Sequence, residues 1–478
     1  MTNITTHNFQ PKTKALGHQI EAINFLNKSS ISALFDEQGM GKSKIVIDSM
    51  LFCLEKKTID SVFVICQKSL LGTWRKEVLK HSYLKSNIIK GNIRQRGRNF
   101  LNFAHFHIMN YETVIQEIEK IKVFLALYKF ALVLDESQVI KNPNSKVTKH
   151  LLQIAPLATK KIIITGTPIA NKPEDIWSQF YFLDSGNTLG DNYENFKKRF
   201  CIKLKGEGEL KKYESELGRL KEQINSCSIR RTKELLELPE KIYVEKFINL
   251  SKDQNYLYRK AKEELCIEIK NADEDIIIKN IDNYLVKLLR LTQIASNPAL
   301  LSSNYLEVPA KFLEIDKILK NILKENKAII WTNFRGNIKT LCKRYKEYGA
   351  QVFYGDIPIA DRDKIVDRFM SEESVRLLIA NPAAAKVGLT LTSANYAIYL
   401  DRNFKMDDYI QSQDRIHRIG QQKKCQIIKL IAKNTIDEYV DEILEKKFLI
   451  AQYALGDIKS LNIDKQFLTK ERILEILG

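Results

Sequence analysis

Short apolar runs rich in β-branched residues recur in two groups along the chain, separated by a long stretch of helical pattern. Each run has the length of a buried strand, and amphipathic stretches of helical period lie between consecutive runs. The runs of the first group are residues 31–37, 61–66, 130–136 and 161–166. Those of the second group are residues 327–332, 351–355, 376–381, 396–401 and 426–431. This alternation predicts βαβ units, and therefore an α/β fold with two parallel-sheet lobes.

The region between the two groups of strands consists of long charged helical segments with few strand signals. This region, residues 191–309, is predicted to be a helical insertion that links the lobes. The N-terminal lobe is predicted at residues 1–190 and the C-terminal lobe at residues 310–445, and residues 446–478 are expected to form helices that pack back onto the lobes. A length of 478 residues also favours more than one domain, because single hydrophobic cores usually stop growing near ~250 to 300 residues.

The charge balance is strongly basic, with 76 Lys and Arg against 58 Asp and Glu and a formal net charge of +18 at pH 7. Such a surface favours a polyanionic partner, because each phosphate that Lys or Arg neutralises releases condensed counterions. A basic surface that serves only solubility explains the same charge equally well. The hydrophobic content of 44% and the charged content of 28% are globular values and exclude a disordered or fibrous chain.

The 7 cysteines are scattered, with no CxxC pair and no histidine at zinc-ligand spacing. Neither a zinc site nor a secreted disulfide framework is expected, so free thiols in a reducing compartment are the simplest interpretation. No apolar run approaches the ~18 residues that span a bilayer, and the N-terminus lacks an apolar signal core. We therefore expect a soluble intracellular protein without a membrane partner, cytoplasmic in a bacterium or virus and nuclear in a eukaryote.

A glycine-containing loop, DEQGMGKS, follows the first predicted strand. Its backbone N–H groups would approach a phosphate, its lysine would reach the β- and γ-phosphates, and its serine would open a helix and bind Mg²⁺. The residues concerned are Gly39, Met40, Gly41, Lys42 and Ser43. A strict P-loop begins with glycine where this chain has Asp36, and a tight strand-to-helix turn would use the same glycines.

A carboxylate pair, Asp135 and Glu136, ends the strand at residues 130–136. In folds of this kind the two carboxylates lie beside the P-loop. One can hold Mg²⁺ while the other orients and deprotonates the attacking water. An Asp-Glu pair alone is usually a solvated strand end, but its position after a β-branched strand favours the catalytic interpretation.

A glutamine and two arginines recur at helical spacing in the second half of the chain. Gln411, Arg415 and Arg418 fall at i, i+4 and i+7 and are predicted to share one helical face. Two arginines presented together suit the charge that develops on a γ-phosphoryl group, and an arginine finger is worth ~10³ to 10⁵ in rate. An exposed basic helix would not explain this register.

The motif series as a whole resembles that of the SWI/SNF-type family, which are superfamily-two, DNA-stimulated ATPases. The matching segments are residues 36–43, 70–77, 133–142, 165–184, 288–301, 330–334, 388–395 and 411–422. They occur in the family's order within residues 16–438, and the TGTPIxN…W and DRIHRIGQ segments are specific to this family rather than to RNA helicases. The resemblance implies two RecA-like lobes, ATP and Mg²⁺ as cofactors, and double-stranded DNA as the partner.

Matching positions carry the family's roles onto this chain. Gln19 matches the glutamine that reads adenine, Lys42 and Ser43 the P-loop pair, and Asp135 and Glu136 the metal and water carboxylates. Thr165 and Thr167 match the coupling motif, and Gln411, Arg415 and Arg418 match the sensor and the arginine fingers. Four residues lie in or beside segments that resemble DNA-facing motifs: Trp74, Lys141, Asn142 and Thr332.

The chain departs from the family pattern in three places. Gln138 replaces the histidine often seen at the fourth position of the DExH box, which bears on the coupling between the carboxylates and lobe closure. Residues 381–386 replace a more usual polar, glycine-rich stretch, which puts DNA contacts by that loop in doubt. No targeting module is recognisable beside the core, so a monomeric core is expected, and targeting to DNA either comes from a protein partner or is absent. A basic segment at residues 90–100 reads as a loop that lies along a phosphate backbone or is simply solvated.

The sequence thus predicts a two-lobed motor that hydrolyses ATP in the cleft between lobes and steps along duplex DNA, remodelling DNA or protein–DNA complexes. A helicase that separates or anneals strands of DNA or RNA is the first alternative. A catalytically silent nucleic-acid-binding scaffold is the second, although a scaffold has no need of a P-loop, a carboxylate pair and an arginine pair together.

Overall fold

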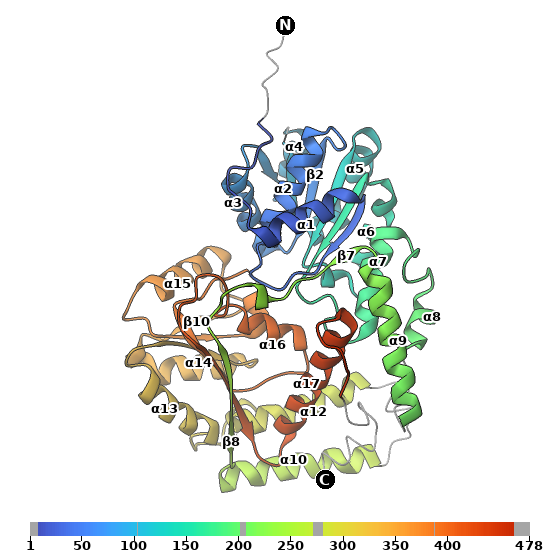
Figure 1. Ribbon diagram of the computed structural model, residues 1–478. Coiled ribbons are helices and arrows are strands. Elements are labelled where there is room, and N and C mark those ends of the chain that lie inside the picture. The colour runs from blue at the N-terminus through green and yellow to red at the C-terminus, as the bar shows by residue number, and fades with distance from the viewer. Residues whose placement is uncertain (1–7, 103, 201–206, 271–280, 387, 463–478) are drawn as a thin grey trace. The chain divides into compact units, whose positions relative to one another are not determined.

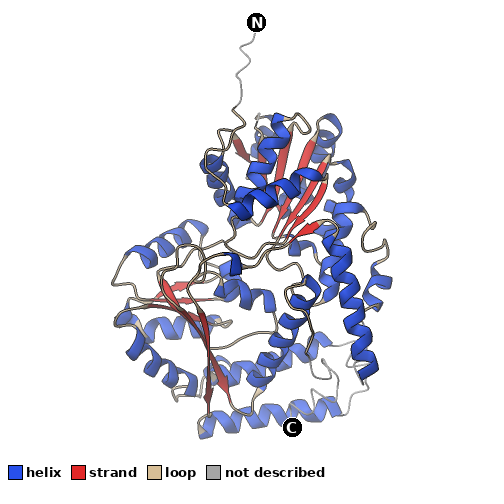
Figure 2. Ribbon diagram, in the orientation of Figure 1, coloured by secondary structure: helices blue, strands red, loops and turns tan. Residues whose placement is uncertain are grey.

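The computed structural model describes residues 8–102, 104–200, 207–270, 281–386 and 388–462. They form two compact units (Figure 1). Unit 1 is drawn from Met1–Ile202, Lys211–Leu236 and Ile450–Leu461, and unit 2 from Lys203–Leu210, Glu237–Leu449 and Asn462–Gly478. Each unit contains one sheet, whose strands are red in Figure 2.

Unit 1 is built on a parallel sheet with the strand order β3-β4-β2-β5-β6-β1-β7. Its strands are β1 (Ile31–Leu34), β2 (Ser61–Cys66), β3 (Ser86–Ile88), β4 (Phe106–Asn110), β5 (Phe130–Asp135), β6 (Lys160–Ile164) and β7 (Ser228–Ile229). The neighbouring strands pair in parallel throughout. Strand β2 is buried along its whole length, as expected for a parallel strand that is covered on both faces.

The helices of unit 1 pack on both faces of its sheet, so an apolar core lies on each face. They are α1 (Gly17–Lys28), α2 (Lys42–Glu55), α3 (Leu71–His81), α4 (Ile93–Leu101), α5 (Tyr111–Leu127), α6 (Lys146–Ile154), α7 (Trp177–Asp184), α8 (Tyr193–Lys198) and α9 (Glu207–Asn225). Val62 and Val64 of β2 pack into a cluster with residues of α1, α2 and α3. Phe63 lies between them in sequence and points to the other face, where it stacks on Phe130 and contacts Phe124 of α5. This alternation is the two-residue period of a strand.

The register of the sheet brings three strand ends of unit 1 to one level. Leu34 of β1 pairs with Ile164 of β6, and Ile164 pairs with Asp135 of β5. Because the strands are parallel, the segments that follow β1, β5 and β6 emerge at the same edge. Ligands bind at this edge in sheets of this type, so the predicted P-loop and carboxylate pair belong to one neighbourhood.

Unit 2 is built on a second parallel sheet with the strand order β10-β11-β9-β12-β13-β8. Its strands are β8 (Lys241–Ile248), β9 (Lys327–Trp331), β10 (Gln351–Phe353), β11 (Leu377–Ala380), β12 (Ala394–Tyr399) and β13 (Cys425–Ala432). Ala328 and Ile330 of β9 pack into one core cluster, and Ile329 and Trp331 pack into another. Both faces of this sheet are therefore covered.

The helices of unit 2 pack around this sheet. They are α10 (Lys252–Lys270), α12 (Ile281–Ser296), α13 (Ala310–Ile322), α14 (Arg335–Arg344), α15 (Ile359–Ser371), α16 (Met406–Gln413) and α17 (Ile436–Leu455). The last residues of α17, from Ile450, belong to unit 1. Among the described residues, no helix combines the length and the apolar character that a membrane span requires.

The predicted α/β class with two parallel-sheet lobes is confirmed, and each strand predicted from the sequence is present. Four further strands, β3, β4, β7 and β8, were not predicted. Two of them, β7 and β8, come from residues 191–309, so this region is not purely helical but adds one strand to each sheet. Residues 201–206 and 271–280 of this region, and residues 463–478 of the predicted C-terminal helices, lie outside the described residues.

The basic segment at residues 90–100, predicted to be a loop, forms most of helix α4 instead. Asn92 caps the helix, because its side chain accepts a hydrogen bond from the backbone N–H of Gln95. Arg96 is buried, and its Nε donates to Glu117 of α5 over 2.6 Å. At least this arginine therefore has a partner inside the protein.

Candidate active site

The loop after β1 has the backbone of a phosphate-binding loop. Gly39 and Gly41 have φ angles of 93° and 81°, in the left-handed region that favours glycine. A Cβ atom at Gly41 would also lie 2.4 Å from Nε2 of Gln19, so a side chain there would be strained by its backbone conformation and would displace the Gln19 amide. Lys42 begins α2, and its Nζ donates to the backbone carbonyls of Asp36 at 2.9 Å and Glu37 at 3.1 Å. The loop thus curls around an ammonium group at the positive end of a helix, an arrangement that suits an anion.

Gln19 of α1 is packed against this loop. Its Nε2 donates to the carbonyl of Met40 at 3.3 Å, and its Oε1 accepts from the backbone N–H of Leu16 at 3.0 Å. The side chain is buried. The structure therefore places Gln19 beside the P-loop, and its predicted contact with adenine stays a prediction.

Asp36, which stands where a strict P-loop has glycine, is a fully buried half of an ion pair. Nε of Arg231 donates to its Oδ1 at 3.0 Å, and a second guanidinium nitrogen contacts its Oδ2. Arg231 follows β7, and its carbonyl accepts from the backbone N–H of Glu37 at 3.0 Å. Sequence reasoning missed Arg231. The only signal was the adjacent pair Arg230 and Arg231 in a region assigned to the insertion.

The carboxylate pair lies at the end of β5, as predicted. Oδ1 of Asp135 accepts from the backbone N–H of Glu136 at 3.0 Å, and Oδ2 accepts from the indole N–H of Trp74 at 2.7 Å. Glu136 has φ 53° and ψ 52°, a left-handed conformation that costs energy in a non-glycine residue and is enriched at functional sites. Its Oε1 accepts from Nε2 of Gln38 at 3.0 Å, and its Oε2 accepts from Nε2 of Gln138 at 2.7 Å. The side chain of Gln38, in the P-loop, thus contacts the Glu136 carboxylate directly.

Burial, and after it the charge of Glu136, raises the pKa of the Asp135 carboxyl to about 7. A nearby cation would therefore stabilise the ionised form of Asp135. The oxygens of Asp135 and the hydroxyl of Ser43 are hard donors of the kind that Mg²⁺ prefers. Each carboxylate oxygen has one hydrogen-bond donor within the protein and a further lone pair to offer. These residues fit the predicted Mg²⁺ site.

Two of the four residues predicted to contact DNA lie in the interior instead. Trp74 is 2% exposed and its indole serves Asp135. Thr332 is fully buried and donates to Oδ2 of Asp401 at 2.5 Å. Side chains in these positions do not reach a nucleic acid, so the prediction for both is corrected.

The other two predicted DNA contacts lie beyond the carboxylate pair. Lys141 is partly exposed, with its Nζ 3.9 Å from Oδ2 of Asp175. Asn142 is exposed, and its side chain accepts from the backbone N–H of Asn144 at 2.9 Å. The coupling residues follow β6, where Oγ1 of Thr165 accepts from the backbone N–H of Thr167 at 3.0 Å. Their roles stay predictions.

The glutamine and two arginines of unit 2 do not share one helical face, which corrects the helical reading. Helix α16 ends at Gln413, so Gln411 is helical while Arg415 and Arg418 lie in the turns that follow. The backbone carbonyl of Arg415 accepts from Leu391 N–H at 2.9 Å. A guanidinium nitrogen of Arg418 donates to the carbonyl of Leu389 at 3.0 Å. The segment at residues 388–395 thus positions both arginines.

Asp401 is the centre of a buried polar network in unit 2. Besides Thr332, its carboxylate accepts from the backbone N–H of Asn333 at 2.7 Å and from the hydroxyl of Ser296 at 3.1 Å. Asn381, the first residue of the departing segment 381–386, donates to the carbonyl of Asn333 at 3.1 Å. The network joins segments that the sequence matched to separate motifs, and burial raises the pKa of Asp401.

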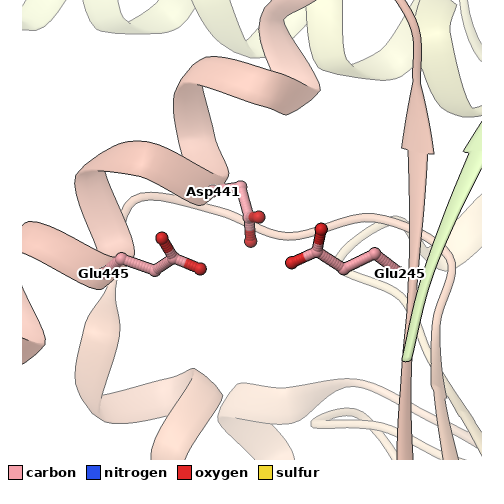
Figure 3. A group of neighbouring side chains, drawn as sticks. All are labelled: Glu245, Asp441 and Glu445. Carbon is pink, nitrogen blue, oxygen red and sulfur yellow. The ribbon is translucent and has the colours of Figure 1, made fainter. Parts of the chain in front are cut away.

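A cluster of three carboxylates in unit 2, Glu245, Asp441 and Glu445, has the spacing of a metal site (Figure 3). Nζ of the buried Lys429 lies 2.7 Å from Glu245, 3.0 Å from Asp441 and 3.3 Å from Glu445. Lys429, together with Arg402, which pairs with Asp441, therefore compensates most of the charge of this cluster from within the protein.

A P-loop and a carboxylate pair at one edge of a parallel sheet, with a second α/β unit, define a helicase-like ATPase domain. The chain matches the SNF2-related domain over residues 18–300 and the helicase conserved C-terminal domain over residues 310–420. The chain belongs to the SNF2-related family. The predicted SWI/SNF-type membership and the predicted ATPase class are thereby confirmed.

Curated relatives are longer than this chain. An uncharacterized ATP-dependent helicase of Mycoplasma genitalium is 31% identical over 93% of this chain and 42% of its own length. The TATA-binding protein-associated factor MOT1 of Saccharomyces cerevisiae is 26% identical over 93% of this chain and 27% of its own length. The chain therefore spans less than half of either relative.

Among solved structures, the SWI2/SNF2 ATPase core of Sulfolobus solfataricus in complex with double-stranded DNA is similar. It is 26% identical, covers 95% of this chain and 98% of its own, and has a TM-score of 0.45.

Proposed function

We propose that this protein is an ATP-dependent translocase on double-stranded DNA. The observation that supports the hydrolytic part of the proposal is the hydrogen bond between Gln38 of the P-loop and Glu136 of the carboxylate pair, at 3.0 Å. It joins the phosphate-binding and water-activating halves of a hydrolytic site within unit 1.

In the proposed reaction, Lys42 and the N–H groups of the loop bind the β- and γ-phosphates. Glu136 accepts the proton of the attacking water, and the amides of Gln38 and Gln138 hold its carboxylate in place. Asp135 and Ser43 would hold Mg²⁺, which neutralises charge on the phosphates when it is bound.

Unit 2 contributes the remaining groups in this proposal. Arg415 and Arg418 stabilise the charge that develops on the transferred phosphoryl group, and Gln411 senses the nucleotide. Because the phosphate-binding loop and the arginines belong to different units, hydrolysis requires the units to close on the nucleotide. Closure and opening would then drive movement along DNA.

The proposed track is the phosphate backbone of duplex DNA. The net charge of +18 supports a polyanionic partner, and backbone contacts carry no sequence information. The similar Sulfolobus core was solved with double-stranded DNA. Targeting to particular sites would come from a protein partner.

The direct test is steady-state ATP hydrolysis by the purified chain with and without duplex DNA, beside a Lys42→Ala variant. The proposal expects turnover that duplex DNA stimulates and that the variant lacks. Stronger stimulation by single strands or RNA would favour a strand-separating helicase. Absence of hydrolysis under all these conditions would refute the enzymatic assignment.

A further inference from the structure

Trp74 of α3 reaches from the core of unit 1 into the candidate active site. Its ring packs in a cluster with Leu70, Leu71 and Val78, and only 2% of the residue is exposed. Its Nε1 donates to Oδ2 of Asp135 over 2.7 Å. A rigid side chain clamped by the core therefore holds one oxygen of the proposed metal-binding carboxylate.

The other two tryptophans show that a buried indole does not need a carboxylate. Nε1 of Trp177 donates to the backbone carbonyl of Gly190 at 3.0 Å. Nε1 of Trp331 is buried with no hydrogen-bond partner in the described part of the chain. A hydrogen bond to a charged acceptor is stronger than one between neutral groups, so the Trp74 contact is the one that fixes the position of its acceptor.

Asp135 is fixed on three sides. Trp74 holds Oδ2, the backbone N–H of Glu136 holds Oδ1, and the hydroxyl of Tyr111 donates to the backbone carbonyl of Asp135 at 2.7 Å. Of these three contacts, only the indole sets the plane of the carboxylate from outside the Asp-Glu segment. Each carboxylate oxygen keeps a further lone pair for a metal ion.

We propose that Trp74 is a positioning residue that orients the Asp135 carboxylate for the divalent cation of the nucleotide substrate. This inference rests on the proposed ATPase function. Partners that orient a metal ligand typically affect metal affinity or activity by about 10- to 100-fold when they are removed. If Trp74 served only to pack the core, its substitution would lower the stability of the protein without changing its affinity for the metal ion.

The test compares Trp74→Phe with the matched control Trp177→Phe, both in the full chain. Each variant removes an indole N–H from a buried position of unit 1, but only the first contact involves a carboxylate. The measurements are the Mg²⁺ concentration that gives half-maximal ATP hydrolysis, the binding of a fluorescent ATP analogue with Mg²⁺ and with EDTA, and the melting temperature.

We expect Trp74→Phe to raise the half-maximal Mg²⁺ concentration by about tenfold or more. Nucleotide binding in EDTA should stay within about twofold of wild type. Trp177→Phe should leave both quantities unchanged. If Trp74→Phe lowers the melting temperature but leaves the Mg²⁺ dependence of hydrolysis and of binding unchanged, the positioning role is wrong.

A measurement on the wild-type chain covers the case in which Trp74→Phe does not fold. In protein labelled with ¹⁵N-tryptophan, the indole signal of Trp74 should shift when Mg²⁺ is added to the ATP-bound chain, and that of Trp177 should not. An unmoved Trp74 signal would overturn the inference. A wild-type chain that binds Mg²⁺ and ATP with this shift but hydrolyses nothing would refute the proposed function and leave the positioning role standing.

Discussion

Arg231 and Asp36 form a buried ion pair at the first position of the P-loop, with Nε of Arg231 3.0 Å from Oδ1 of Asp36. The side chain of Asp36 is fully buried and that of Arg231 is 7% exposed. The two residues lie far apart in the sequence, because Asp36 follows β1 and Arg231 follows β7. It explains how a charged residue can begin a phosphate-binding loop without repelling phosphate, because the adjacent guanidinium balances its charge.

Removing one partner of this pair should destabilise unit 1. Arg231→Gln leaves a buried carboxylate without its countercharge, which typically costs about 3 to 5 kcal/mol. Hydrogen exchange of peptides from β1 and α2 should accelerate accordingly, and ATP should bind more weakly. The control is Arg344→Gln, which breaks a half-exposed pair with Asp316 in unit 2 and should cost about 1 kcal/mol or less. Equal and small effects in both variants would contradict a structural role for the pair.

Glu136→Gln should separate ATP binding from hydrolysis. The change removes the proton acceptor but leaves the P-loop and Asp135 in place, so turnover should fall by about 10²-fold or more while ATP remains bound. Lys42→Ala should lose both properties, because it removes a phosphate ligand. Filter binding and steady-state kinetics measure the two effects. Retention of more than about a tenth of wild-type turnover by both variants would end the assignment.

Arg415→Ala and Arg418→Ala should each lower kcat by about 10³-fold or more while ATP still binds to unit 1. The reason is that a finger contact is made to charge that exists only in the transition state. Helix α16 ends before both arginines, but Arg415 is only 1% exposed, so the melting temperature of each variant is the structural control. A raised Kd for ATP with kcat preserved would show that the arginines bind ground-state nucleotide instead.

His107 of β4 should make unit 1 less stable in mild acid. Burial lowers the pKa of His107 to about 4 from its ordinary 6.5, beside Phe63 and Phe130. Between these two pH values, His107 therefore binds a proton in the unfolded chain but stays neutral in the folded chain. The stability contributed by the neutral ring is complete above pH 6.5 and falls as the pH drops towards 4, by about 2 kcal/mol at pH 5. His107→Phe should remove this part of the acid loss in urea unfolding at pH 7 and 5. An identical acid loss in the variant would exclude His107 as its source.

Features of the fold could be predicted where their signal lies in neighbouring residues. They could not be predicted where they depend on residues far apart in the sequence. The P-loop and β2 were predictable because their signals lie in consecutive residues, such as Gly39 to Ser43 and the apolar run from Ser61 to Cys66. The partner of Asp36 was not, because Arg231 reaches it only through the pairing of β1 with β7. Strand β8 was missed because its exposed edge positions dilute the apolar pattern.

The candidate site shows the same division. Asp135 and Glu136 were found by their place after a strand, but the donors that hold them were not. Trp74 resembled a DNA contact by motif, and only the packing of α3 against the sheet turns its indole inward. Helical spacing predicted that Gln411, Arg415 and Arg418 share one face, whereas α16 ends at Gln413, before both arginines.

The central claim, movement along an intact duplex, is tested most directly by displacement of a third strand from a DNA triplex. The account predicts that the wild-type chain displaces the third strand when ATP is present and a duplex track adjoins the triplex. Glu136→Gln should leave the triplex intact. Separation of a forked duplex with no triplex displacement, or hydrolysis stimulated by duplex without displacement, would contradict translocation on double-stranded DNA.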